Sequence, residues 1–586
     1  MGLRLLNRLD SKIIYRAVFL MSILGVFAFI GDFGYEQSPF AQRVINGYYL
    51  IVLLLGISTT VIRYLSNKKA LSTRVVVFDA ISILIISYII AIHFFSREAH
   101  LSFLYNDIWV KVAILLTFVR EFAEQRVNYK RSYLNPAQLF IVSFLGIILI
   151  GTFLLMLPKA TYDGLGFLNA LFTSTSAVCV TGLIVVDTGT YFTPFGQTII
   201  LLLIQMGGLG ILTFASSFSY FFKGMSSYEN QVVLGDMTNA QKIGEVFSNL
   251  KRILAITFMI EILGAVFIFF STTKDMFPTF LGRFFFAVFH SVSAFCNAGF
   301  STLSNSLYEE GFRFNYFLQL IVITLIVLGG LGFPIVINLL KYLKYKFRFY
   351  FFRSTTARQA RPWVLNLNSR ITLITTFSLL VGGTILFYFN EYNNTLAVHD
   401  GFGKVVGALF EAVTPRTAGF NNVDMGALHF STLMLTILLM WIGASPASTG
   451  GGIKTSTFAI ATLNFLSLAK GKNRIEVYRR EIAELSVRRA FAIISLSLLV
   501  IGLAITGISI FDSDKSLLSI AFECFSAYST VGLSVGITAG LSSASKGIII
   551  MVMFIGRVNA LTILIALFNK MKFTEYRYPT EEILIN

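Results

Sequence analysis

Four short segments of the chain share one pattern, a small or β-branched residue, then Gly, then Leu or Phe. They read SAVCVTGL at 176–183, SAFCNAGF at 293–300, TPRTAGF at 414–420 and SAYSTVGL at 526–533. Their glycines are Gly182, Gly299, Gly419 and Gly532, which are 117, 120 and 113 residues apart. Spacing this regular indicates an internal duplication rather than chance similarity.

Glycine at these positions permits a chemistry that uses backbone oxygens. A dehydrated K⁺ ion needs its lost water oxygens replaced, and carbonyls from four segments around one axis can replace them. Glycine has no Cβ, so it reaches backbone angles that point successive carbonyls at the axis. A helix before each motif would direct its partially negative C-terminus at the ion, which favours a cation. We therefore predict a K⁺ site formed at the four motif glycines.

The predicted selectivity filter consists of the last three residues before each Leu or Phe. These are Val180, Thr181, Gly182, Asn297, Ala298, Gly299, Thr417, Ala418, Gly419, Thr530, Val531 and Gly532. For a single copy, close helix packing by a small residue would be the better explanation. Four copies in the same context favour the filter.

The elements around each motif also repeat. A segment of about ten residues precedes the motif, for instance 166–176 or 284–293, and it is too short to cross a bilayer. It suits a re-entrant helix. Non-helical backbone at membrane depth is tolerated only where it is buried in protein or lines a water-filled cavity. The order span, loop, short helix, motif, loop, span therefore predicts a shared aqueous path after residue 136.

The second long apolar run of the third copy, at about 431–468, is interrupted by GASPASTGGGIKTST at 443–457. Pro446 removes an amide donor and clashes with the preceding turn, so no straight helix continues through it. We predict a non-helical loop here, in preference to a kink that serves helix packing, and the family resemblance given below implies that this loop is a gate. The predicted gate residues are Gly443, Ser445, Pro446, Ser448, Thr449, Gly450, Gly451, Gly452, Lys454 and Arg557. The other second runs carry related glycine-containing segments at 206–210, 328–332 and 555–559.

Several charged or polar residues lie inside apolar runs. Arg557 stands in the last run, where a central charge costs about 2.5–3.5 kcal/mol on insertion scales unless it meets water or a partner. It could place a positive charge at the gate, cap backbone carbonyls, or do both. For Glu411, Glu523 and His290 on the short helices, we expect buried hydrogen bonding rather than a proton relay. Arg416 is expected to face the extracellular vestibule or to brace the third motif.

The composition places the chain in a bilayer. Of its 586 residues 55% are hydrophobic and 13% charged, and the mean hydropathy is +0.74. The net charge of +17 does not indicate nucleic acid, because the basic residues lie in short segments between apolar runs. Cys179, Cys296 and Cys524 have no ligand-like spacing, so we expect no metal centre and no disulfide. The spans contain no GxSxG, HExxH or paired aspartates, so we do not expect an enzyme.

Alternating basic segments predict four spans between residues 17 and 120, eight between 136 and 569, and both termini in the cytoplasm. The fourth span, 108–119, is short and contains Lys111. The fold class is thus an all-α polytopic membrane protein, with four tandem repeats around one pore preceded by about four extra transmembrane helices. The predicted domains are an N-terminal membrane extension (1–130), pore repeats at 131–250, 251–365, 366–485 and 486–572, and a cytoplasmic tail (573–586).

The duplicated pattern and its VTGL, NAGF, TAGF and TVGL motifs resemble the superfamily of K⁺ transporters called Trk, Ktr and HKT. STVGL at 529–533 also resembles the TVGYG filter of potassium channels. The resemblance implies K⁺ uptake across the plasma or inner membrane, gating by the loop 443–457, and K⁺ preference because residue 182 is Gly rather than Ser. Arg557 matches an Arg that the family places below the filter. The following residues, Val558, Asn559 and Ala560, depart from the family's usual Leu-Gly-Pro.

The resemblance also implies a homodimer and cytoplasmic regulatory subunits that bind ATP, ADP or NAD. The chain has no soluble domain large enough for a nucleotide, so its only predicted cofactor is the transported K⁺. The basic stretch 341–370 could contact such subunits or anionic lipid. Whether transport is channel-like or a symport with Na⁺ or H⁺ stays open. A sodium- or proton-coupled transporter of another solute fits less well, because such carriers use one or two unwound helices.

The four extra spans have no predicted role beyond shielding or dimer packing. Asp32 and Asp79 lie in or near their apolar runs. A voltage sensor would need a regularly spaced series of arginines, which these spans lack.

Overall fold

The computed structural model describes residues 2–66, 73–92, 108–124, 136–221, 246–273, 276–351 and 365–567. The predicted tail 573–586 and the middle of the basic stretch 341–370 lie outside these ranges. The chain divides into two compact units. Unit 1 contains Met1–Tyr129 and Leu157–Tyr162, and unit 2 contains Lys130–Met156 and Asp163–Asn586. Helices dominate both units.

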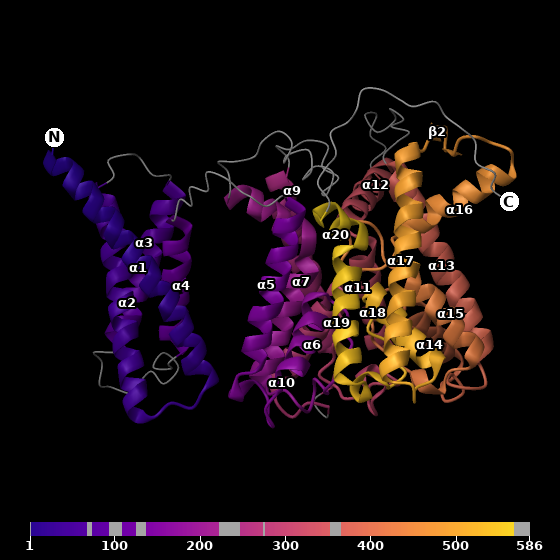
Figure 1. The fold of residues 1–586 in the computed structure, drawn as a ribbon, viewed down its shortest axis with the longest axis horizontal. Helices are drawn as coiled ribbons and strands as arrows, with labels where there is room; N and C mark the ends of the chain where they lie inside the picture. The colour runs from indigo at the N-terminus through magenta and orange to yellow at the C-terminus, as the bar shows by residue number, and fades with distance from the viewer. Residues whose placement is uncertain are drawn as a thin grey trace. The chain divides into compact units, whose positions relative to one another are not determined.

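Unit 1 contains four helices that stand side by side (Figure 1). They are α1 (Gly2–Gly34), α2 (Pro39–Ser66), α3 (Thr73–Ile90) and α4 (Ile108–Glu124). A short 3-10 turn, η2 (Pro158–Ala160), also belongs to this unit. The core consists of fully buried apolar residues such as Val52, Leu53 and Ile114.

Two acidic residues of unit 1 pair with the basic residues of α4. Asp32 lies 3.0 Å from Lys111, and Asp79 accepts from Arg120 at 2.5 and 2.8 Å. A charge inside a membrane is tolerated best when it has a partner. The pairs therefore explain how α4 carries Lys111 within an otherwise apolar run.

Unit 2 contains four successive sets of helices. The first set is α5 (Pro136–Leu155), α6 (Phe167–Val178) and α7 (Pro194–Phe221). The second is α9 (Val246–Ser271), α10 (Phe280–Cys296), α11 (Tyr316–Leu331) and α12 (Phe333–Phe351). The third is α13 (Leu367–Glu391), α14 (Gly401–Val413), α15 (Phe430–Trp441) and α16 (Thr455–Ala469). The fourth is α17 (Glu484–Phe511), α18 (Leu517–Ser529), α19 (Ser543–Val558) and α20 (Ala560–Leu567).

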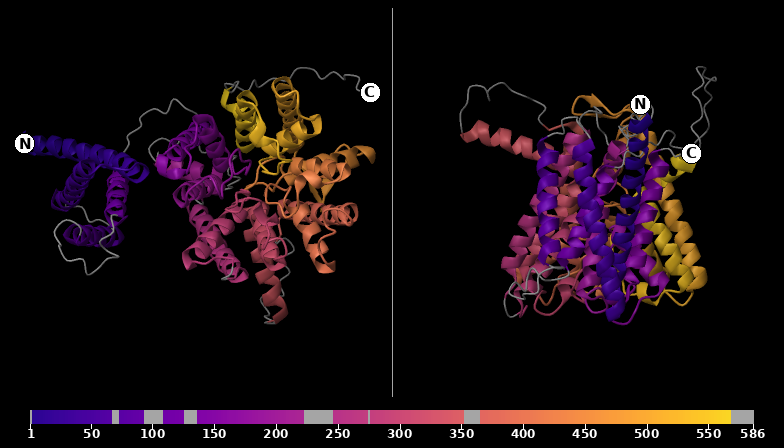
Figure 2. Two further views of the ribbon diagram at one scale, coloured as in Figure 1. Left: turned by 90° about the horizontal axis from the view of Figure 1, so that it is seen from below. Right: turned by 90° about the vertical axis from the view of Figure 1, so that its left-hand side faces the viewer.

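The four sets follow one another around a common centre, as the left panel of Figure 2 shows. Short 3-10 turns lie in three of the sets, η4 (Ser306–Tyr308), η6 (Met425–Ala427) and η7 (Thr538–Gly540). A small antiparallel hairpin, β1 (Glu476–Val477) and β2 (Arg480–Glu481), joins α16 to α17.

Local sequence signals start these helices. α5 and α7 begin at Pro136 and Pro194, and proline suits the first helical turn because its missing N–H would have no partner there. The side chains of Asn366, Ser516 and Ser542 accept from backbone N–H groups at the starts of α13, α18 and α19, at 2.8, 3.1 and 3.3 Å. Such N-caps satisfy donors that the helix itself leaves open.

The last long helix of every set is broken. α7 kinks at Gly210 (φ 52°), α11 and α12 meet at Gly332 (φ 78°) with a bend of 106°, and α19 and α20 meet at Asn559 (φ 76°) with a bend of 86°. The last apolar run, which contains Arg557, is therefore not one straight span. The third set breaks over residues 442–454. Gly and Asn are the residues that most readily adopt left-handed backbone angles.

Buried apolar residues hold the short helices in place. One cluster includes Phe286, Phe295 and Phe410 of α10 and α14, and another includes Phe522 of α18 and Val531 of the fourth motif. Side chains this well buried fix the angle at which each short helix delivers its glycine motif.

By length and composition, five described helices qualify as membrane spans, or seven if each bent pair counts as one span. Their outer faces carry exposed large apolar side chains, for instance Phe270 at 73% and Leu503 at 66%. Apolar surface of this kind suits contact with lipid rather than water. In Figure 1, the segments after the breaks, α12, α16 and α20, lie towards one end of unit 2, and the short helices α6, α10 and α14 lie nearer the other.

Candidate functional site

The four glycine motifs share an unusual backbone. The first and third residue of each triplet have left-handed φ angles: Val180 57°, Gly182 90°, Asn297 60°, Gly299 69°, Thr417 73°, Gly419 80°, Thr530 51° and Gly532 96°. The middle residues do not. Left-handed angles at non-glycine residues are uncommon and concentrate at functional sites. Successive carbonyls alternate between the two sides of an ordinary strand, whereas a left-handed angle at every second residue turns successive carbonyls towards one side.

The motifs also contact one another in a closed ring. A Cβ added to any motif glycine would collide with the carbonyl oxygen of the middle residue in the next motif. The contacts run from Gly182 to Ala298, from Gly299 to Ala418 at 2.8 Å, from Gly419 to Val531, and from Gly532 back to Thr181. Any side chain at these glycines would enter the ring. The four motifs therefore enclose one narrow axis that is walled by backbone.

Hydroxyl groups at the ends of the short helices brace the motifs. In the first and fourth motif, a serine accepts from the glycine N–H, Ser176 from Gly182 and Ser526 from Gly532, both at 3.1 Å. In the second and third, a hydroxyl donates to the carbonyl after the glycine, Ser293 to Phe300 at 2.7 Å and Thr414 to Phe420. This bracing role was not predicted from the sequence. The available signal was a hydroxyl residue five or six positions before each motif glycine.

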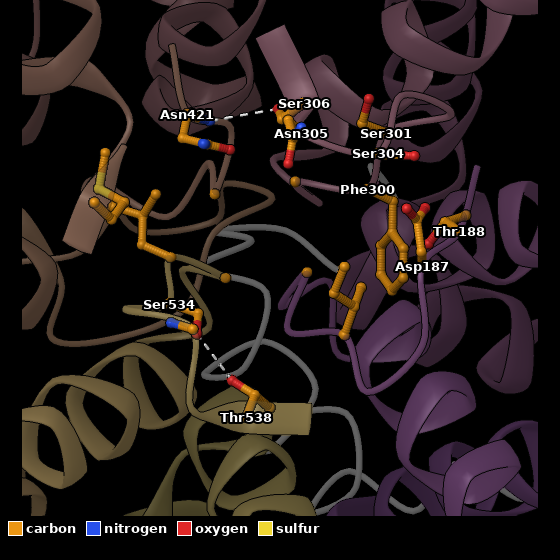
Figure 3. A pocket seen from close by; sticks show the side chains of 18 of the residues that line it. Asp187, Thr188, Phe300, Ser301, Ser304, Asn305, Ser306, Asn421, Ser534 and Thr538 are labelled. Atoms are coloured by element: carbon orange, nitrogen blue, oxygen red, sulfur yellow. Dashed lines mark hydrogen bonds between the residues drawn. The ribbon is translucent and has the colours of Figure 1, made fainter. Parts of the chain in front are cut away.

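An outer cavity of about 360 Å³ lies on one side of the ring, and all four motif glycines line it. Figure 3 shows side chains from the loops after the motifs around it, with Ser534 and Thr538 3.1 Å apart and the Asn421 N–H 3.4 Å from the Ser306 hydroxyl. Asp187 and Asp424 add carboxylates. Among the described residues that line this cavity there is no Lys, Arg or His, so these two carboxylates give it a negative charge, which favours cations.

An inner cavity of about 230 Å³ is lined by Lys454, Arg557 and Asn559, among others. The loop 442–454 contributes to its wall and also touches the motifs. A Cβ on Gly450 would meet the Thr417 hydroxyl, and a Cβ on Gly451 would meet the Thr530 hydroxyl. The loop therefore separates the ring from the inner cavity.

Neighbouring helices hold this loop through backbone hydrogen bonds. Ser445 and Thr449 donate their N–H groups to the carbonyls of Gly330 and Gly329, at 2.9 and 3.4 Å. The Thr449 hydroxyl donates to the Phe295 carbonyl at 3.3 Å.

Within the loop, the Ser448 hydroxyl donates to the Ser445 carbonyl at 2.6 Å. Pro446 and Ala447 pack beside Gly332, where a Cβ would approach their carbonyl oxygens at 2.9 and 2.8 Å.

Two cationic side chains also hold the loop, the half-buried Lys454 at its end and the buried Arg557 of α19. Lys454 donates to the carbonyls of Gly450 and Gly451 at 2.6 and 3.4 Å. Arg557 donates to the Thr449 carbonyl and, at 2.6 Å, to the Gly207 carbonyl of α7. Arg557 thus does cap backbone carbonyls, and it joins the loop to the kinked helix of the first set.

The non-helical segment ends earlier than predicted. α16 begins at Thr455, so the last three residues of the predicted range 443–457 are helical. An isolated parallel bridge between Ile442 and Ile453 closes the base of the loop. The backbone of Lys454 is extended (φ −69°, ψ 144°), as is usual for the residue before a helix.

Of the three residues predicted to form buried hydrogen bonds, Glu411 is buried, but neither of its carboxylate oxygens has a hydrogen-bond partner within the described ranges, so that prediction is not confirmed for it. Glu523 and His290 are buried and hydrogen bonded around the motifs. Glu523 accepts from the hydroxyls of Ser534 and Thr538 at 2.5 and 2.7 Å, and the His290 ring lies 2.9 Å from the Ser301 hydroxyl. These contacts agree with hydrogen bonding behind the motifs.

Arg416 does not line the outer cavity, and its side chain extends towards the loop 442–454. Its guanidinium donates to the carbonyls of Gly443 and Thr376, at 3.3 and 3.4 Å. Of the two predicted positions, the structure shows the bracing one.

A buried carboxylate in α9 was missed altogether. Glu261 is 4% exposed and accepts from the Gln205 amide at 3.1 Å. Its hydroxyl-bearing neighbour Ser291, on α10, donates to the Glu261 backbone carbonyl at 2.6 Å. An acidic residue within the apolar run 252–271 was the available signal.

Comparison with known proteins places these features in context. The family model TrkH, described as a cation transport protein, matches residues 104–576. The potassium/sodium uptake protein NtpJ of Enterococcus hirae is 35% identical over 465 residues, covering 78% of this chain and 98% of that protein. The Ktr system potassium uptake protein B of Bacillus subtilis is 35% identical over 453 residues, covering 77% and 96%.

Among solved structures, the potassium transporter TrkH of Vibrio parahaemolyticus superimposes with a TM-score of 0.58 at 18% identity. The match covers 83% of this chain and 96% of that one. At this identity, the likeness is one of fold.

Proposed function

Because the chain belongs to the TrkH family of cation transport proteins, within the Trk, Ktr and HKT superfamily, we propose that it takes up K⁺ across the cell membrane through the ring of glycine motifs. The observation that carries this proposal is the closed contact ring in which each motif glycine lies against the middle carbonyl of the next motif. The relatives named as potassium uptake proteins support K⁺ as the ion.

In this proposal, unit 2 is a set of four pore repeats at 131–250, 251–365, 366–485 and 486–572. Hydrated K⁺ enters the outer cavity, and carbonyls of the twelve filter residues 180–182, 297–299, 417–419 and 530–532 replace its water. The short helices α6, α10, α14 and α18 direct their C-termini at the ion, and each favours a cation by about 0.3–1 kcal/mol. The hydroxyl braces keep the carbonyls aimed inward, so the site is formed before the ion arrives.

The loop 442–454 is the proposed gate. It lies against the threonines of the third and fourth motif and is held by Lys454 and Arg557. Two fixed positive charges beside the path raise the barrier to a cation. For K⁺ to pass into the inner cavity, the loop must leave this position.

We further propose a homodimer with both termini in the cytoplasm. Separate nucleotide-binding subunits would act on the gate, because relatives are named as components of a Ktr system. The basic stretch 341–370 would face these subunits or anionic lipid. A symport with Na⁺ is a second form of the same function, favoured because NtpJ is described as a potassium/sodium uptake protein, and flux with and without external Na⁺ distinguishes the two.

Uptake assays with Gly182→Ser test the filter. The wild-type chain should restore growth at low K⁺ in cells that lack their own K⁺ importers. In Gly182→Ser, the added side chain would press on the Ala298 carbonyl, so the preference for K⁺ over Na⁺ should fall about tenfold, the effect of roughly 1.4 kcal/mol.

Gly146→Ser is the matched control, because a Cβ at Gly146 in α5 meets nothing within 4 Å. This variant should transport as the wild type does. If the wild type shows no cation-dependent flux, the proposed function is wrong. If Gly182→Ser keeps the wild-type preference, the ring does not select the ion.

A further inference from the structure

The third motif differs from the others at the residue just before the triplet. Cys179, Cys296 and Ser529 occupy that position in the first, second and fourth motif, and all three are fully buried. The third motif has Arg416 there, which is also buried, at 7% exposure. A long charged side chain therefore occupies a position where the duplication otherwise places a small neutral one.

The surroundings of the third motif explain where this side chain fits. In the other sets, a glycine of the broken helix packs directly on the last turn of the short helix. These contacts join Gly207 to the Val178 carbonyl, Gly329 to the Phe295 carbonyl, and Gly556 to the Tyr528 carbonyl. In the third set α15 ends at Trp441, and the loop begins instead. Arg416 reaches into this gap and binds the Gly443 carbonyl.

A small cavity remains beside the guanidinium. It measures about 20 Å³ and is lined by Arg416, Thr376, Gly330 and Ala444, among others. The Nε of Arg416 and the hydroxyl of Thr376 are buried, and neither has a hydrogen-bond partner within the described ranges. No carboxylate from those ranges lies within 4.0 Å of the guanidinium.

This cavity has the size and the lining that one water molecule needs. A site for one water requires about 10–15 Å³ and two or more polar partners. Leaving a buried donor and a buried hydroxyl unpaired would be costly, and native structures satisfy such groups with protein or ordered water. The two carbonyl contacts of Arg416 are long, at 3.3 and 3.4 Å, so they leave the guanidinium incompletely solvated.

We propose that Arg416 is a hydrated strut between the third motif and the loop 442–454, with one ordered water in this cavity bound to Arg416 Nε and the Thr376 hydroxyl. The backbone of Arg416 is fixed because Thr417 directly follows it in the ring. Its guanidinium holds Gly443, next to the Ile442–Ile453 bridge that closes the loop. Arg416 is thus a positioning residue that resists displacement of the loop. Its effect on flux rests on the proposed function, whereas the water does not.

The water is tested by structure determination of the full-length protein, at a resolution that shows ordered solvent. The wild type should show one density peak within hydrogen-bond distance of both polar atoms. Thr376→Val preserves the shape but removes the hydroxyl, so the peak should vanish. Thr375→Val is the matched control, because the Thr375 hydroxyl is already satisfied by the Ile371 carbonyl at 2.8 Å. An empty cavity in the wild type, or a peak that persists in Thr376→Val, overturns the water site.

The strut is tested by K⁺ flux in proteoliposomes. Arg416→Gln removes a charged donor from the loop, so basal flux should rise about tenfold, and Arg416→Lys should restore part of the restraint. Thr376→Val should raise flux by about two- to threefold, and it gives a readout if Arg416→Gln does not fold. Thr375→Val should match the wild type.

A double variant separates a strut from general support of the fold. If Arg416 acts through the loop, Arg416→Gln should change flux less than about twofold in a chain that already lacks residues 447–452. Equal effects in both backgrounds, or a fall in basal flux, contradict the strut. If the wild-type protein carries no K⁺, the proposed function is wrong. The water site is then still tested by the presence or absence of the density peak beside Arg416 and Thr376.

Discussion

At the scale of single residues, Asn559 shows how a departure from a family pattern is accommodated. It occupies the middle position of the usual Leu-Gly-Pro pattern, where the family resemblance leads us to expect glycine. Its φ of 76° is left-handed. A positive φ is uncommon outside glycine and is several-fold enriched in Asn, whose short polar side chain bonds locally, and the ψ of 125° lies outside the left-handed helical well. Here the Asn559 side-chain oxygen accepts from the Leu561 N–H at 3.2 Å, at the start of α20. One residue therefore breaks α19 and also caps α20.

Asn559 variants should separate these two roles. Asn559→Gly keeps the left-handed angle and loses only the cap, so stability should change by a few tenths of a kcal/mol. Asn559→Ala loses both and should destabilise the protein by about 1–2 kcal/mol. Thermal unfolding of the purified protein measures the difference, with Asn464→Ala in the interior of α16 as control. An Asn559→Ala protein as stable as the wild type would mean that the bend does not depend on this residue.

At the scale of elements, the sequence allowed the motifs to be predicted but not all of their supports. The motif positions and the interrupted third run follow from local residue types, because Gly and Pro act through their own backbones. The breaks lie inside the segments 206–210, 328–332 and 555–559 that the sequence singles out, but the residue that bends the helix within each segment did not follow from local residue types. In MGGLG at 206–210, Gly207 packs on the Val178 carbonyl, whereas Gly210 bends the helix. Both residues are glycine, so only the tertiary contact with Val178 distinguishes them. The direction of Arg416 depended on the gap that the loop leaves, which no local pattern encodes.

Deletion of residues 447–452 tests the loop as an element. The deletion removes the Thr449 contacts with Arg557 and Phe295, so the barrier below the ring should fall and K⁺ flux should rise by about tenfold or more, as expected for loss of one or two charged hydrogen bonds. Preference for K⁺ over Na⁺ should persist, because the hydroxyl braces of the motifs lie outside the loop. Flux in proteoliposomes with each cation measures both quantities. Unchanged or slower flux would show that the loop does not restrict passage.

At the scale of the whole molecule, unit 1 is a compact unit distinct from the four sets of helices in unit 2. It has its own apolar core and its own ion pairs, so its helices do not depend on unit 2 for burial of charge. The family model begins at residue 104, and NtpJ is matched over 98% of its length by only 78% of this chain. The basic segments and apolar runs predict an extension at 1–130, and this remains a prediction. They could not predict the pairing of Lys111 and Arg120, because those partners come from different helices.

A chain that lacks residues 2–129 should therefore still transport K⁺. The four motifs, their braces, the loop and Arg557 all lie in unit 2, and a compact unit with its own hydrophobic core can fold independently. We expect uptake within a few-fold of the full chain per molecule in the membrane, and the same loss of K⁺ preference when Gly182→Ser is added. Uptake is compared after the amount of protein in the membrane has been equalised. We do not expect unit 1 to take a direct part in transport, because most of its residues precede residue 104, where the match to the family model begins. A truncated protein that inserts at normal levels but carries no K⁺ would show that it does.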